Sequence, residues 1–170
     1  MQITQKIAPC LWFDSRAEEA AAFYVSVFKN SKITSEAKYT KAGQDTHKQR
    51  SGSVMTVAFE LDGQPFTALN AGPLFKFNEA VSFQVSCRDQ EEVDYYWDKL
   101  SKGGDPKAQQ CGWLKDKYGL SWQVVPTILP ELLKDHESPT AQRAMEAILR
   151  MKKIDVRELE QAVAREHVTR

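Results

Sequence analysis

A chain of 170 residues with 42% hydrophobic and 27% charged content is long enough for one compact domain and too short for two full-sized ones. Lysine and arginine balance aspartate and glutamate at 23 each, and the balance also holds separately in residues 1–126 and 127–170. A nucleic-acid-binding protein or a basic protein of membrane surfaces needs a field of one sign, so we expect neither a nucleic acid nor a membrane as partner.

The first predicted module starts with an apolar strand over residues 7–13 and continues into a helix. Ser15 and Glu18 have the spacing of a capping box, and apolar residues at 20, 23, 24 and 27 predict the buried stripe of that helix. Three strands are then predicted at 33–40, 53–61 and 66–70. The polar segment 40–52 predicts a long loop of the kind that often covers a pocket.

A second module repeats this order farther along the chain. Residues 81–87 predict a strand, Asp89 and Glu92 a helix cap, and the apolar positions 93, 96, 97 and 100 the buried stripe of the next helix. Strands follow at 109–114 and 121–125, with residues 115–119 as a charged hairpin turn between them. We therefore predict an α+β protein with paired βαβββ modules, about 1–72 and 79–126, within a body of residues 1–126.

Residues 127–170 form a separate helical tail in this prediction, because they contain no aromatic residue and no glycine. Ser138 before Pro139 is a typical helix start, and Asp155 with Glu158 has the spacing of a second capping box. Two short amphipathic helices result. Their apolar stripes need a partner, which is either the body of the same chain or a second subunit.

Histidine and cysteine are scarce and scattered. The histidines, His47, His136 and His167, lie far apart, and the three cysteines form no CxxC pair, so we expect reduced, mostly buried thiols. The chain starts without a long apolar run behind a basic flank, and it has no apolar stretch of about 18 residues. We expect a cytoplasmic protein.

Several segments together resemble the PhnB-like branch of the vicinal-oxygen-chelate superfamily: residues 9–13, 17–20, 66–70, 81–83, 110–126 and 151–155. The superfamily includes glyoxalase I, bleomycin-resistance proteins and extradiol dioxygenases, and this branch often carries the label 3-demethylubiquinone 3-methyltransferase. The resemblance implies sheets that curve around a ligand cavity, and a homodimer. It also places the superfamily's metal-binding positions at about Ala8 or Pro9, Thr67, Ser82 and Gln123.

Those positions carry poor ligands for a transition metal, because neutral hydroxyl and amide groups bind such ions weakly. We therefore expect no metal and no cofactor. Matching the two modules by their helix caps turns Cys10, Trp12, Ser82 and Gln84 toward the cavity. The candidate ligand-binding residues are Cys10, Trp12, Thr67, Asn70, Ser82, Gln84, Trp113, Trp122 and Gln123.

The main hypothesis is a small-molecule-binding protein, without a metal, that holds a partly aromatic or hydrophobic molecule between tryptophan side chains and polar groups. Whether it also catalyses a reaction stays open. The alternative for the tryptophans is a place in the core, and for the strand 82–86 a solvent-facing position. Alternative functions are a metal-dependent lyase, isomerase or dioxygenase with unconventional ligands, and a methyltransferase, although no glycine-rich strand-to-helix turn is present.

Overall fold

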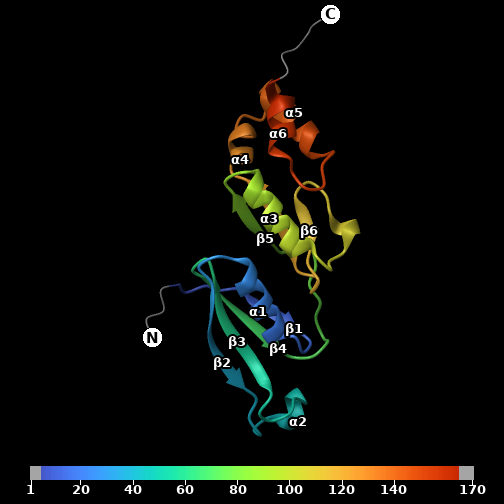
Figure 1. The fold of residues 1–170 in the computed structure, drawn as a ribbon. Coiled ribbons are helices and arrows are strands. Elements are labelled where there is room, and N and C mark those ends of the chain that lie inside the picture. Colours follow the sequence, from blue (N-terminus) through green and yellow to red (C-terminus); the bar gives the residue numbers. More distant parts are fainter. Residues whose placement is uncertain (1–4, 165–170) are drawn as a thin grey trace, which may run out of the picture. The chain divides into compact units, whose positions relative to one another are not determined.

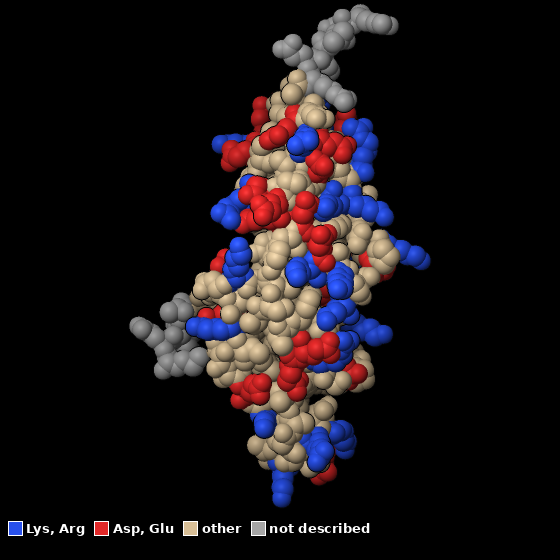
Figure 2. Space-filling model, viewed as in Figure 1, with Lys and Arg blue, Asp and Glu red and all other residues tan. Residues whose placement is uncertain are grey.

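The computed structural model describes residues 5–164, which form two compact units divided between Phe77 and Asn78 (Figure 1). Each unit contains one of the predicted modules. Within residues 5–164 no helix has the length and apolar character needed to cross a bilayer. Acidic and basic side chains are mixed over the face of the molecule shown in Figure 2.

The first unit is a βαβββ module with a four-stranded sheet. It consists of β1 (Cys10–Phe13), α1 (Ala17–Val27), β2 (Lys32–Lys38), the single turn α2 (Gln44–His47), β3 (Val54–Leu61) and β4 (Gln64–Asn70). The strand order is β1-β4-β3-β2, with β1 parallel to β4 and the other pairs antiparallel. This confirms the first predicted module, although its first strand begins at Cys10 rather than at residue 7.

Helix α1 covers one face of this sheet. Tyr24 and Val27 on the helix and Val57 and Phe59 on β3 are almost completely buried, as the apolar spacing predicts. Phe59 stacks between the rings of Tyr24 and Phe66. The alternating side chains of the strands point to the opposite face, which no helix among residues 5–77 covers.

The predicted capping box at the start of α1 is wrong. Arg16 occupies the N-cap position, and within the described residues its side chain caps no backbone N–H. The N–H of Ala17 donates instead to the side-chain oxygen of Asn70, at 2.8 Å. A residue 53 positions away in the chain thus performs the function that the local pattern assigns to Ser15.

The second unit begins with a smaller module. It contains β5 (Ser82–Cys87), α3 (Gln90–Ser101), the 3₁₀ helix η1 (Pro106–Ala108), β6 (Trp113–Lys115) and β7 (Ser121–Pro126), and its strand order is β5-β7-β6. The strand predicted at 109–114 is confined to Trp113–Lys115, because Cys111 and Gly112 have positive φ angles of 54° and 84° that interrupt an extended chain. The cap of α3 is confirmed: Asp89 accepts from the N–H of Glu92 at 2.9 Å.

The tail forms α4 (Ile128–Leu132), α5 (Pro139–Ile148) and α6 (Val156–Ala164). Both predicted caps are present, since Ser138 accepts from the N–H of Ala141 at 3.1 Å and Asp155 from that of Glu158 at 2.8 Å. Residues 165–170, which include His167, lie outside the described residues.

The described part of the tail packs on the second module of its own chain. Its buried apolar residues form a cluster against which Cys111 and Val125 of the module also pack. The N–H groups of Cys111 and Gly112 donate to the carbonyls of Met151 and Lys152, each at 2.8 Å. The apolar stripes therefore have a partner in cis. The members of this tail cluster are Leu129, Ala144, Ala147, Ile148, Met151, Ile154 and Leu159.

Candidate functional site

Three predicted site residues share the open face of the first sheet. Leu11 and Phe13 are buried, whereas Cys10 and Trp12 alternate with them and face the other way. Thr67 lies directly beside Cys10 in the parallel pairing of β1 and β4. The indole N–H of Trp12 donates to the carbonyl of Gly72 at 2.8 Å, and the ring of Phe75 packs edge-on against the indole, with 4.8 Å between centroids.

Asn70 is also part of the first unit, but its side chain is used within the fold. It is 6% exposed. Its oxygen accepts from Ala17, and its nitrogen donates to Glu18 at 2.6 Å and to the carbonyl of Val54 at 3.1 Å. These bonds join the end of β4 to the start of α1 and to β3. They leave little capacity for a ligand.

On the second sheet the structure brings three predicted residues together. Ser82 and Gln84 lie on β5, and Gln123 lies opposite Gln84 on the parallel strand β7. Gln84 donates to the side-chain oxygen of Gln123 at 3.2 Å, and Gln123 donates to the hydroxyl of Ser82 at 2.8 Å. We call this hydrogen-bonded set, Ser82, Gln123 and Gln84, the polar row. It lies on the sheet face opposite α3, because Val85 and Cys87, which have the opposite alternation to Gln84 on β5, are buried on the helix-covered face.

Trp113 extends the polar row to the third strand. It is the direct partner of Gln123 in the antiparallel pairing of β6 and β7, so both side chains share one face. Its side chain is half-buried and lines a pocket of about 410 Å³ together with Glu79, Ala108, Gln110 and Cys111. The pocket therefore adjoins the polar row.

Trp122 faces the other way. It pairs with Leu114, both residues are buried, and its indole N–H donates to the carboxylate of Asp116 at 2.9 Å. The same carboxylate accepts from the N–H groups of Tyr118 and Leu120. Asp116 is thus a buried anchor of the β6–β7 turn, and Trp122 packs on the helix-covered side of the sheet.

Two charged residues that are not among the predicted site residues lie beside Trp113. The sequence pattern assigns Lys115 to a hairpin turn, and it gives no role to Glu79. Lys115 ends β6, and its ammonium group forms an ion pair with Glu79. The hydrogen bond from Lys115 holds the pKa of the Glu79 carboxyl below its usual value. Strand alternation is the signal that could have found Lys115, because it stands two residues after Trp113 on the same strand face.

The residues at the superfamily's metal positions do not fit a divalent transition metal. Ser82 and Gln123 are hydrogen-bonded to one another, and Thr67 and Ala8 supply no charge. In the described part of the chain no three His, Cys, Asp or Glu residues are grouped so that they could hold an ion. We therefore derive no chemical step through a metal.

Two of the cysteines, Cys10 and Cys87, have environments that oppose activation as nucleophiles. Burial, together with the nearby carboxylates of Glu92 and Asp89, raises the pKa of the Cys87 thiol to about 12. Cys10 is exposed and Cys111 half-buried, so only Cys87 is a buried thiol as the sequence predicts for most of them. Partial desolvation nevertheless raises the pKa of the Cys10 thiol above its usual value. Both shifts lower the thiolate fraction at neutral pH, which is the opposite of what a nucleophilic cysteine needs.

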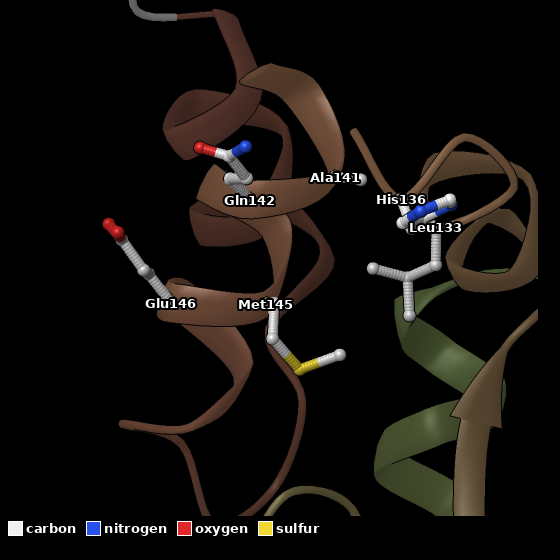
Figure 3. Close-up of a pocket in the computed structure, with 6 residues that line it drawn as sticks. All are labelled: Leu133, His136, Ala141, Gln142, Met145 and Glu146. Atoms are coloured by element: carbon white, nitrogen blue, oxygen red, sulfur yellow. The ribbon is translucent and has the colours of Figure 1, made fainter. Parts of the chain in front are cut away.

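A second pocket, of about 390 Å³, lies in the tail (Figure 3). The side chain of Met145 on α5 points toward Leu133, which follows α4, whereas Glu146 extends away from the pocket. His136 is near its edge and is largely exposed. The lining is mainly apolar and brings together no set of groups that could perform acid–base or nucleophilic chemistry.

Comparison with known proteins gave one family and several similar folds. The model of a family described as 3-demethylubiquinone-9 3-methyltransferase matches residues 5–125. The PhnB protein of Bacillus cereus is 36% identical, with a TM-score of 0.61, over 72% of this chain and 100% of its own. No curated protein matched.

Two more distant structures support the fold alone. Protein PA1353 of Pseudomonas aeruginosa is 17% identical, with a TM-score of 0.55, over 72% of this chain and 98% of its own. The fosfomycin-resistance protein FosX of Mesorhizobium loti is 16% identical, with a TM-score of 0.53, over 79% of this chain and 100% of its own. The match to the family model ends at residue 125, so the tail lies beyond it.

Proposed function

The chain belongs to the PhnB-like family described as 3-demethylubiquinone-9 3-methyltransferase, within the vicinal-oxygen-chelate superfamily, and from this membership we propose that it binds a small planar organic molecule. One observation carries the proposal: the polar row and the half-buried Trp113 lie side by side on the open face of the second sheet. An aromatic surface beside a few ordered polar groups is the usual composition of a small-molecule site.

The two parts of this surface have separate tasks in the proposal. The indole of Trp113 supplies apolar area on which a flat ring stacks. Gln84 is exposed at the end of the polar row, and its amide can both donate to and accept from a polar group of the ligand. Because Ser82 and Gln123 hold one another, the row is ordered before a ligand arrives, which reduces the entropy lost on binding.

The first sheet carries a parallel set of candidates. Cys10, Trp12 and Thr67 share its open face, and we propose that they form a second candidate contact surface for a small molecule within the first unit. Asn70 and Trp122 are left out of the contact set because both side chains are buried on the helix-covered sides of their sheets and bonded within the fold.

A test should localise binding as well as detect it. The four tryptophans give four indole N–H signals in a ¹⁵N–¹H spectrum, which Trp-to-Phe variants assign. We expect planar fragments such as 2-naphthoate and 2-naphthamide to shift the Trp113 signal and not that of Trp97, which is a buried residue of α3. Gln123→Leu should weaken binding about tenfold, the effect of losing one hydrogen bond of about 1.4 kcal/mol.

The matched control is Gln142→Leu, which changes an exposed glutamine of the tail. It should leave the affinity of the fragments unchanged. The proposal would be contradicted if no fragment moved the Trp113 signal. It would also be contradicted if both glutamine variants weakened fragment binding equally.

Methyl transfer, which the family description names, has no favourable observation in this chain. The turns that join β1 to α1 and β5 to α3 consist of residues 14–16 and 88–89 and contain no glycine to admit a nucleotide phosphate. Calorimetric titration with S-adenosylmethionine tests this directly. Saturable binding at micromolar concentration would restore methyl transfer as a candidate.

We further propose that the protein is a cytoplasmic homodimer. Leu74 and Phe75 in the first unit are 72% and 59% exposed, and Phe75 packs against Trp12. Such exposed apolar residues favour association with another protein surface. Light scattering after gel filtration should give about twice the chain mass of 19.3 kDa. A constant mass of one chain at all concentrations would contradict the dimer.

A further inference from the structure

We propose that the molecule bound beside Trp113 carries one negatively charged group, such as a carboxylate, which Lys115 receives when Glu79 moves away. This inference rests on the proposed function, and it adds the chemical class of the ligand. It would make the ligand a planar organic anion, with the ring on Trp113 and the charge on Lys115.

Strand geometry sets the distance between the two contacts. Trp113 and Lys115 alternate on β6 with the buried Leu114, so their side chains leave the same face of the sheet. Residues two apart on a strand are about 7 Å from one another. That separation matches an aromatic ring with an acidic group attached to it directly or through one carbon.

The ion pair between Lys115 and Glu79 is unequal in a way that suits exchange. The Lys115 side chain is 24% exposed, whereas the Glu79 side chain is 61% exposed. Glu79 can therefore return to water at little cost, while a partly buried ammonium group needs a replacement anion. Glu79 also lines the pocket next to Trp113, so its departure opens the way from the pocket to Lys115.

An unsatisfied hydroxyl next to Lys115 is an independent observation. Ser121 pairs directly with Lys115 on one side and with Ser82 on the other, so it lies between the ion pair and the polar row. Ser121 is 1% exposed, and its hydroxyl has no hydrogen-bond partner within residues 5–164. A buried polar group without a partner is costly, and a hydroxyl can donate to an anion held by Lys115.

The test compares acids with their neutral amides. The probes are matched pairs, 2-naphthoate with 2-naphthamide and indole-3-acetate with indole-3-acetamide, followed by the Trp113 indole signal. We expect each acid to bind about tenfold more tightly than its amide, and the difference to shrink as salt is raised. Lys115→Met should abolish the difference, and Glu79→Gln should increase the affinity for the acid because a competing carboxylate is gone.

The control is Lys107→Met, which replaces an exposed lysine of the same unit. It should change the affinity for neither the acids nor the amides. Equal binding of acid and amide at Trp113 would overturn the anion inference and leave the proposed function standing. Absence of binding by both compounds would overturn both. A Lys115→Met variant that loses acid and amide alike, with an otherwise unchanged spectrum, would show that Lys115 does not act through its charge, and this too would overturn the inference.

Discussion

Asn70 shows how a single buried amide can connect three elements. It ends β4, accepts from the first N–H of α1 and donates to Glu18 on α1 and to the carbonyl of Val54 on β3. The superfamily resemblance places Asn70 close in sequence to a ligand position at about Thr67, so it is predicted to contact a ligand. The tertiary structure uses both donor hydrogens and one acceptor site of its amide for the fold.

Asn70→Ala should destabilise the first unit by about 2–3 kcal/mol, because it leaves the buried N–H of Ala17 and the carbonyl of Val54 without partners. Urea denaturation measures the change in the free energy of unfolding. Asn78→Ala is the matched control, since Asn78 is exposed, and it should change that free energy by no more than about 0.5 kcal/mol. Equal effects of the two substitutions would refute the role of Asn70.

Cys87 gives the second unit a predictable pH dependence. Its pKa is raised from 9.0 to about 12 by burial and by Glu92 and Asp89, so the folded protein keeps a proton that the unfolded chain releases near pH 9. The protonated Cys87 thiol therefore contributes to the free energy of unfolding in full below pH 9, and this contribution is lost as the pH rises from 9 toward 12. Urea midpoints from pH 7 to 10 should fall more steeply for the native protein than for Cys87→Ala. Parallel pH profiles would contradict this account.

Among the elements, the turn at Cys111 and Gly112 decides the shape of the second sheet. Both residues adopt the left-handed backbone conformation. A Cβ on Gly112 would lie 2.9 Å from the carbonyl oxygen of Val124 and 3.0 Å from the Cδ1 atom of Ile154. The apolar and polar alternation around residue 110 predicts a longer strand. Close approach of the tail to this turn, which no local pattern reveals, shortens β6 to three residues.

The tail should stabilise the second module through its buried stripe. Leu159→Ala should cost about 2–5 kcal/mol, because Leu159 is completely buried in the tail cluster, whereas Leu149→Ala should cost little because Leu149 is 57% exposed. Both are leucines of the same tail, so the pair separates packing from composition. Urea denaturation gives the two free energies.

The same variants report on the site. Because Met151 and Lys152 accept from the N–H groups of Cys111 and Gly112, loosening the tail should move the indole signal of the adjacent Trp113. Leu159→Ala should shift that signal and Leu149→Ala should not. A tail that can be destabilised with no change at Trp113 would show that the two are independent.

For the whole molecule, balanced charge predicts the absence of nucleic-acid binding. The formal net charge is zero, and acidic and basic side chains are mixed over the face in Figure 2. We expect no rise in the fluorescence anisotropy of a labelled DNA duplex up to about 100 µM protein at physiological salt, the weak limit of ordinary non-specific binding. The triple variant Glu36→Lys, Glu137→Lys, Glu146→Lys raises the net charge and should bind detectably. Binding by the native chain at micromolar concentration would contradict the expectation.

Local patterns place part of the candidate surface on the second sheet. Strand alternation predicts Ser82 and Gln84 on one face, and the superfamily resemblance predicts Gln123; the structure joins the three by hydrogen bonds next to Trp113. Lys115 was not predicted as a site residue, because a charged residue near a glycine turn is most often a turn residue. Its pairing with Glu79 depends on how the segment before β5 folds back, and that contact leaves no local signal.

The sequence by itself determined the βαβββ pattern of the first module, the helix caps of the second module and tail, and the alternation that separates buried from open strand faces. These features follow from interactions between residues close in the chain, with periods of 2 and 3.6. Only the tertiary structure decided that Asn70 caps α1, that the tail packs in cis on the turn before Trp113, and that Lys115 and Ser121 adjoin the polar row. Each of these is a contact between residues distant in sequence, which depends on how whole elements pack and not on any local pattern.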